Sequence, residues 1–113
     1  MKKIEVIIRP EKLDLVRNAL ENVGCGGLMI SEIEGHGKQK GVMQQWRGEK
    51  YKIVLLPKIK IDIVVRDEDL ENIIKTIIAS AKTGEIGDGK IFISEVIDAI
   101  RIRTEERGEK ALS

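Results

Sequence analysis

A glycine-rich stretch that ends in lysine is the part of this sequence most suited to chemistry. It contains three glycines within six residues and reads Thr83-Gly84-Glu85-Ile86-Gly87-Asp88-Gly89-Lys90. Glycine adopts positive φ without a Cβ penalty, so successive backbone N–H groups can point into one concavity. Lys90 adds a mobile positive charge at the edge of that concavity. Together these features suit the phosphate groups of a nucleotide.

The same stretch fits the phosphate-binding pattern G-x-x-x-x-G-K over residues 84–90. The fit ends at Ile91, which stands where the pattern needs a Ser or Thr to ligate Mg²⁺. The residues that follow predict a strand, whereas a helix normally completes such a loop. Two interpretations therefore stay open on local pattern: a phosphate-binding loop, or a glycine turn that joins a helix to a strand.

Three further basic residues could join Lys90 at one cleft. Arg101 and Arg103 lie two apart in a predicted strand, so both guanidinium groups would face the same way and could clamp phosphate oxygens. Lys58 lies on another predicted strand; the alternative for each of these cations is an ordinary solvated charge. If Mg²⁺ accompanies the phosphates, Gln39 is an oxygen donor within reach.

Catalytic groups are hard to find in this chain. His36 is the single histidine, and we interpret it as loop surface because no Ser or Cys partner accompanies it. The sequence shows no carboxylate pair and no nucleophile–base arrangement, which argues against an enzyme.

Composition excludes several classes of protein. The chain of 113 residues has 20 basic and 19 acidic residues, so its formal charge of +1 argues against a protein that coats nucleic acid or anionic lipid. One cysteine, Cys25, is compatible with a reducing cytoplasm. No apolar stretch approaches the roughly 18 residues of a membrane span, and we expect neither a signal peptide nor a transmembrane helix.

Hydrophobic periodicity predicts the elements that must position these residues. Alternating apolar residues predict strands, and apolar stripes at the 3.6-residue period predict helices over about 11–23 and 70–82. The predicted strands cover 3–8, 28–34, 58–66 and 91–103, the last continuing or kinking near Asp98. This order is the β-α-β-β-α-β plan of a ferredoxin-like α+β fold, with two helices on one face of the sheet. We predict one domain over residues 1–113.

The connection over residues 36–55 is longer than a hairpin needs. It contains Trp46 and Tyr51, and between residues 36 and 52 it has five basic residues against one acidic residue. Basic loops with exposed aromatic residues often bind partners, which is our prediction for this loop. The alternative is a disordered charged insertion.

The sequence resembles the PII nitrogen-regulatory signal-transduction proteins over nearly its whole length. The segments that carry the resemblance are 83–92, 1–4, 35–41, 56–61 and 100–104. It implies a homotrimer without enzymatic activity, with ATP or ADP in the clefts between subunits and 2-oxoglutarate beside Mg-ATP. The family's loops correspond to a T-loop at 36–55, a B-loop at 82–90 and a C-terminal segment at 102–113.

The resemblance also implies site residues. The nucleotide would contact Ile7, Gly27, Met29, Gly35, Lys38, Gln39, Asp62, Val64, Gly87, Asp88, Gly89, Lys90, Arg101 and Arg103. The 2-oxoglutarate pocket would use Gln39, Lys40, Gly41, Lys58 and Gly87. Within these sets, Gln39 would ligate Mg²⁺ and Lys58 would pair with a carboxylate of 2-oxoglutarate. Lys38, Met29 and Asp62 replace the family's usual arginine, threonine and glutamate.

The implied partners contact the T-loop. Trp46 and Arg47 would bind an ammonium transporter or a nitrogen-assimilation enzyme, and Tyr51 is a candidate for covalent modification. We expect a cytoplasmic protein that reaches the membrane only through a transporter and binds no nucleic acid.

Two rival classes share the fold. One is a small phosphate-ester or nucleotide-processing enzyme, although the strand exit at residues 8–12 lacks a glycine-rich cradle. The other is an RNA-recognition module, which stacks bases on strand aromatics; the predicted sheet offers only Phe92.

Overall fold

The computed structural model of the chain describes residues 1–39 and 52–112, with backbone alone for 36–39 and 52–54. The helices and strands run in the order β1 (Lys2–Ile8), α1 (Leu13–Asn22), β2 (Met29–Gln39), β3 (Lys52–Val65), α2 (Leu70–Ala81) and β4 (Gly89–Glu95). Short 3₁₀ helices lie at Pro10–Lys12, Asp67–Asp69 and Gly108–Leu112. The predicted β-α-β-β-α-β plan is confirmed.

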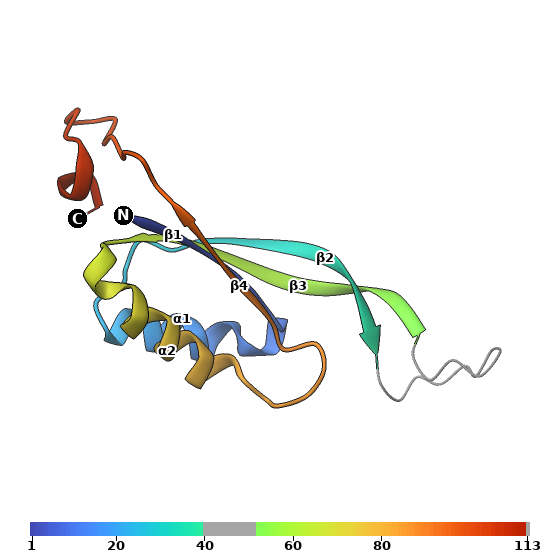
Figure 1. Cartoon of the computed structure of the whole chain (residues 1–113). Coiled ribbons are helices and arrows are strands. Elements are labelled where there is room, and N and C mark those ends of the chain that lie inside the picture. Colours follow the sequence, from blue (N-terminus) through green and yellow to red (C-terminus); the bar gives the residue numbers. More distant parts are fainter. Residues whose placement is uncertain (40–51, 113) are drawn as a thin grey trace.

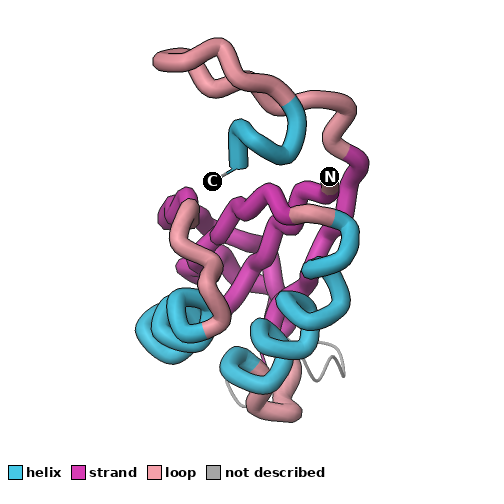
Figure 2. Tube along the Cα trace, turned by 90° about the vertical axis from the view of Figure 1, so that its left-hand side faces the viewer, coloured by secondary structure: helices cyan, strands magenta, loops and turns pink. Residues whose placement is uncertain are grey.

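The four strands form one antiparallel sheet in the order β2-β3-β1-β4. Both helices cover the same face of this sheet, and they pack against each other (Figure 1 and Figure 2). Neither α1 nor α2 lies on the opposite face (Figure 1 and Figure 2). β2 and β4 are the edge strands.

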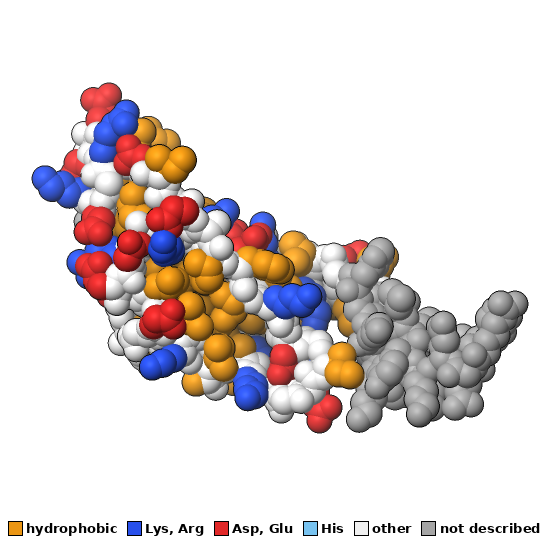
Figure 3. Space-filling model, in the orientation of Figure 1, with side chains coloured by type: hydrophobic (Ala, Val, Ile, Leu, Met, Phe, Trp, Pro, Cys, Tyr) orange, Lys and Arg blue, Asp and Glu red, His pale blue; other side chains and the backbone are white. Residues whose placement is uncertain are grey.

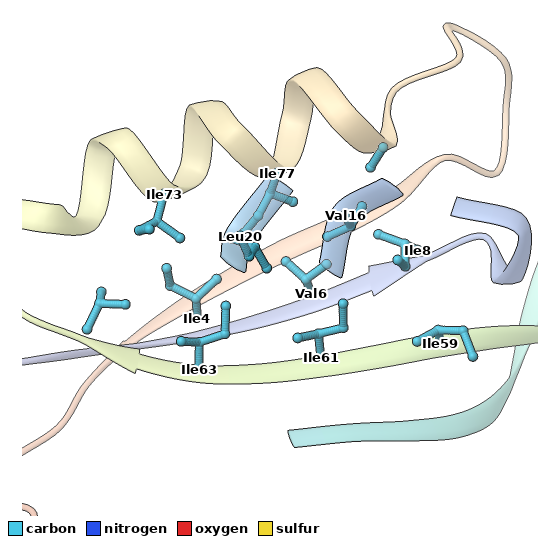
Figure 4. Packing of buried hydrophobic residues seen from close by; sticks show 12 residues of the cluster. Ile4, Val6, Ile8, Val16, Leu20, Ile59, Ile61, Ile63, Ile73 and Ile77 are labelled. Atoms are coloured by element: carbon cyan, nitrogen blue, oxygen red, sulfur yellow. The ribbon is translucent and has the colours of Figure 1, made fainter. Parts of the chain in front are cut away.

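The hydrophobic core lies between the helices and the sheet. Alternation along β1 and β3 sends every second side chain to the helix face, and the helix stripes meet them there. The buried residues, most of them drawn in Figure 4, are Ile4, Val6, Ile8, Val16, Leu20, Ile59, Ile61, Ile63, Val65, Ile73, Ile77 and Ala81. Burial of each large side chain stabilises the fold by about 1.5–3 kcal/mol.

The second and third strands are longer than predicted. β2 continues to Gln39 and β3 begins at Lys52, so both ends of the segment expected as a loop are paired strand. The apolar run 53–56 does not alternate with polar residues, so periodicity did not predict a strand there. Its residue types nevertheless suit a strand. Lys40, Gly41, Trp46, Arg47 and Tyr51 lie outside the described residues.

The prediction of a strand through residue 103 is wrong. β4 ends at Glu95, whose partner Lys2 is the first residue of β1. Val96 makes one more hydrogen bond, from its N–H to the Met1 carbonyl at 3.1 Å, and the pairing of β4 with β1 stops at Glu95. The chain then turns back on itself, and Ile100 forms an isolated bridge with Arg107.

No helix in the described residues is long and apolar enough to cross a membrane.

Candidate functional site

The face of the sheet opposite α1 and α2, which we call the open face, carries many of the predicted site residues. Residues paired directly across antiparallel strands point to the same face, and Ile7 pairs with Lys60 and with Lys90. Asp62 pairs with Met29 on the same face. By the same register the predicted residues on this face are Ile7, Met29, Gly35, Lys58, Asp62, Val64 and Lys90. The structure therefore brings together side chains that come from all four strands.

Asp62 is the buried charged residue of this face. Its Oδ1 atom is buried and accepts no hydrogen bond from any described residue. Lys3 Nζ lies 3.9 Å from that oxygen, and Lys60 Nζ lies 3.7 Å from Oδ2. A buried acceptor without a donor is uncommon in proteins, and a ligand with an N–H or O–H group would satisfy it.

The glycine loop between α2 and β4 is closed by the carboxylate of Asp88. This carboxylate accepts hydrogen bonds from the Thr83 and Gly84 N–H groups, each at 2.9 Å, and from the Thr83 hydroxyl. Arg9 Nε donates a further bond to it at 3.1 Å. The Thr83 contacts in particular, with those of Gly84 and Arg9, hold the pKa of Asp88 well below its usual range. The side chain of Asp88 thus shapes the loop itself.

Two cations hold the carbonyl groups of the same loop. Arg9 Nη2 donates to the Ile86 carbonyl at 2.7 Å, and Lys58 Nζ donates to the Gly87 carbonyl at 2.6 Å. Burial lowers the pKa of Lys58, and the positive charge of Arg9 lowers it further. Two neighbouring cations of this kind favour an anionic ligand.

Two glycines of the loop have a backbone conformation in which any other residue would be strained. Gly87 has φ +101°, and a Cβ there would lie 3.3 Å from Arg9 Nη2. Gly89 has φ +111°, and a Cβ there would lie 1.7 Å from the Ile7 carbonyl oxygen. The first distance is tight and the second is impossible, so the loop needs glycine to pack against the end of β1.

Sequence reasoning missed Arg9. The available signal was its place at the exit of the first strand, immediately before Pro10, where it was interpreted only as the end of that strand. Its contact with Asp88 joins residues 79 positions apart, and sequence spacing alone cannot indicate such a pair.

Within one chain, Lys90 does not lie beside Arg101 and Arg103. Lys90 lies at the start of β4 and the arginines follow its far end. The strand from Lys90 to Glu95 alone spans about 17 Å. Figure 1 shows the glycine loop and the C-terminal residues at opposite ends of β4.

The two arginines are also not in strand register. Arg101 belongs to a turn, where its Nη2 donates to the Lys110 carbonyl at 3.1 Å and its Nη1 lies 3.8 Å from Glu106 Oε1. Arg103 is exposed in the same turn. Their shared orientation was inferred from a strand that ends earlier.

The remaining predicted residues lie near the ends of β2. Gly27 precedes the strand, and Lys38 and Gln39 are its last two residues, paired by backbone with Ile53 and Lys52. The described residues contain no cluster of three or more His, Cys, Asp or Glu suited to a metal ion. Nucleotide-bound Mg²⁺ typically takes only one or two protein oxygens together with phosphate oxygens and waters.

Fold and site together define a small ferredoxin-like protein whose glycine loop is held by hydrogen bonds from Arg9 and Lys58. Comparison with known sequences gives the family: the chain matches the family described as Nitrogen regulatory protein P-II over residues 1–106, and it belongs to that family. The resemblance seen in the sequence is therefore confirmed.

Individual relatives agree over almost the full length. The chain is 56% identical to Nitrogen regulatory protein P-II 2 of Methanothermobacter thermautotrophicus over 112 residues, which are 99% of this chain and 97% of the relative. It is 51% identical to Nitrogen regulatory protein P-II of Microchaete diplosiphon, over 99% of this chain and all of the relative. The family consists of regulatory proteins, and the rival interpretation as a small nucleotide-processing enzyme is not supported.

Proposed function

We propose that this protein is a nitrogen, carbon and energy sensor that binds ATP or ADP, Mg²⁺ and 2-oxoglutarate and controls target proteins through its T-loop. The observation that carries the proposal is the glycine loop. Arg9 and Lys58 hold its carbonyl groups, Asp88 bonds with Arg9 inside it, and Lys90 follows it on the open face of the sheet. A preorganised loop binds phosphate without a large ordering cost.

The base and ribose would lie on the open face. Ile7, Met29 and Val64 supply apolar surface there, and the buried Oδ1 of Asp62 supplies an acceptor for a ligand N–H or O–H group. Apolar walls with few polar groups are typical of nucleotide pockets. The phosphates would reach Gly87, Gly89 and Lys90.

The site would be completed in a homotrimer. Support comes from the separation of Lys90 and Arg101 within one chain, since both are expected to bind phosphate. Support also comes from exposed apolar side chains: Ile97 and Ile102 are each 96% exposed. Figure 3 shows a hydrophobic surface over α2 and β4, where an apolar groove of about 410 Å³ runs between the helix and the edge strand. Surfaces of this kind are commonly covered by partner subunits.

2-Oxoglutarate would bind beside Mg-ATP. Lys58 would pair with one of its carboxylates, next to the loop carbonyl that Lys58 contacts without ligand. Gln39 would ligate the metal, and the backbone of Lys40, Gly41 and Gly87 would complete the pocket. Bound Mg²⁺ would supply positive charge that attracts both the phosphates and 2-oxoglutarate.

The T-loop would carry the signal to a partner. Trp46 and Arg47 have the composition of an interaction hot spot, and Tyr51 is the candidate for covalent modification. The partner would be an ammonium transporter or a nitrogen-assimilation enzyme. The protein would be cytoplasmic and would reach the membrane only through such a transporter.

Isothermal calorimetry with ATP tests the nucleotide site. Loss of a charge-assisted contact of roughly 1.5–3 kcal/mol means that Lys90→Ala should weaken ATP binding about tenfold or more. Lys75→Ala, on α2, removes a lysine outside the site and should leave the affinity unchanged. Equal affinity in Lys90→Ala and the parent would contradict the proposal, and light scattering would show whether the chain is a trimer.

A further inference from the structure

The residues after β4 form a closed hairpin, which we call the C-terminal hairpin and define as residues 98–108. The Arg101 N–H donates to the Glu106 carbonyl at 2.9 Å, and the Glu105 N–H donates to the Arg101 carbonyl at 2.8 Å. The Gly108 N–H donates to the Ala99 carbonyl at 3.0 Å. Both backbone polar groups of Arg101 are therefore used inside the hairpin. This fixes the backbone from which its side chain extends.

One carboxylate fastens the open end of the hairpin. Asp98 Oδ1 accepts hydrogen bonds from the Ala99 N–H at 2.9 Å and from the Gly108 N–H at 3.1 Å. Its Oδ2 accepts a bond from Arg107 Nη1 at 3.0 Å. The outgoing and returning segments are thus held by the same side chain. A short aspartate that bonds nearby N–H groups competes with strand formation, which also explains the turn at this point.

The side chain of Arg101 is directed by the returning segment. It contacts the Lys110 carbonyl, and its Nη1 lies 3.8 Å from Glu106 Oε1. Glu106 belongs to the returning segment of the hairpin, and Lys110 lies two residues after Gly108, whose N–H is bonded to Asp98. A guanidinium has five N–H donors, so it can keep such a contact while it binds phosphate. An arginine that is already ordered loses less side-chain entropy on binding.

We propose that Asp98 is a positioning residue for phosphate binding: by closing the C-terminal hairpin it holds Arg101 where a nucleotide phosphate can meet it. This inference rests on the proposed function, because it assumes that Arg101 contacts the nucleotide. Asp98 itself would not touch the ligand, since a carboxylate repels phosphate.

The hairpin offers a graded set of variants. Asp98→Ala removes all three hydrogen bonds. Asp98→Asn keeps a carbonyl oxygen for the two backbone N–H groups and loses the ion pair with Arg107. Gly108→Ala leaves Asp98 in place but puts a Cβ where φ is +71°. It should therefore weaken the closed end of the hairpin without changing Asp98. Asp14→Ala is the matched control, because it removes a 3.0 Å contact with Arg17 on α1.

ATP affinity measured by calorimetry on the full chain distinguishes positioning from a general defect. We expect Asp98→Ala to weaken ATP about tenfold, Asp98→Asn to lose less than about threefold, and the Asp14→Ala control to match the parent. In the Arg101→Ala background, the effect of Asp98→Ala should fall below about twofold, because a residue that acts through Arg101 has nothing left to position. Gly108→Ala should weaken ATP in the same direction as Asp98→Ala.

Two results overturn the inference alone: ATP affinity of Asp98→Ala equal to that of the parent, or an undiminished loss in the Arg101→Ala background. The second would mean that Asp98 acts on the fold and not through Arg101. If Asp98→Ala does not fold, Gly108→Ala decides by the same comparison. Absence of ATP binding by the unmodified chain would overturn the proposed function and this inference together.

Discussion

Arg9 Nε and Asp88 Oδ1 lie 3.1 Å apart, and this pair joins the end of β1 to the glycine loop. The same guanidinium holds the Ile86 carbonyl, and the same carboxylate holds two N–H groups at the start of the loop. The loop is therefore fastened at its beginning, middle and end. Its shape depends on a residue that lies far from it in the sequence.

Asp88→Asn should make the protein less sensitive to acid. The folded-state pKa of Asp88 lies below its unfolded value near 4, so the carboxylate stabilises the fold above that pH. This contribution is lost as the pH falls from about 4 toward the lower folded pKa. We expect the parent's thermal unfolding temperature to drop across this range more steeply than that of Asp88→Asn. Equal slopes in melts from pH 6 to pH 2 would contradict a depressed pKa of Asp88.

Gly89→Ala should damage the loop and the end of β1 together. The added methyl would overlap the Ile7 carbonyl oxygen at 1.7 Å, and the residue would also keep an unfavourable positive φ. We expect a loss of more than about 1 kcal/mol in the free energy of unfolding. Gly26→Ala is the control, because its Cβ would meet nothing within 4 Å. Denaturant unfolding of both variants measures the difference, and similar midpoints would show that the close approach does not constrain the loop.

Leu20→Ala should destabilise the protein by about 2–5 kcal/mol, because it opens a cavity between α1 and the sheet. Leu20 is fully buried, whereas Leu15 on the same helix is 55% exposed. Leu15→Ala should therefore cost less than about 1 kcal/mol. Chemical denaturation compares the two variants. Equal losses would mean that α1 buries a different face.

Binding of 2-oxoglutarate should depend on Mg-ATP. ADP lacks the γ-phosphate that completes the proposed metal site with Gln39, so we expect no binding in its presence and a coupling of about 1–3 kcal/mol with Mg-ATP. Gln39→Ala and Lys58→Ala should both weaken 2-oxoglutarate. Calorimetry measures these affinities, and fluorescence of Trp46, the single tryptophan, reports on the T-loop. Equal binding with ADP, or without Mg²⁺, would show that another group controls the loop.

Arg47→Ala should abolish capture of the natural partner while ATP affinity stays at the parental value. The reason is that arginine beside tryptophan is typical of binding hot spots, which lose about 2 kcal/mol or more when truncated. A pull-down from native extract, repeated with and without 2-oxoglutarate, measures capture. Lys75→Ala, on α2, serves as the matched surface control. Unchanged capture by Arg47→Ala would place the interface elsewhere on the protein.

The sequence by itself determined the order of elements and the core. Strand alternation in 59–65 and the helical stripes of α1 and α2 are local patterns, since a buried face repeats every second residue in a strand and every 3.6 residues in a helix. Membership of the P-II family was also visible in the sequence, because its motifs are continuous segments.

Only the tertiary structure decided how the site residues are distributed. Pairing between β4 and β1 ends at Glu95, and Arg101 lies in a hairpin instead of a strand; the local apolar pattern does not show where this pairing ends. The contact between Asp88 and Arg9 likewise joins segments that are distant in sequence, so local patterns could not show it. The physical reason is the same in each case. Periodicity in the sequence shows which face of an element is buried, whereas hydrogen-bond partners depend on which elements lie close together in the folded chain.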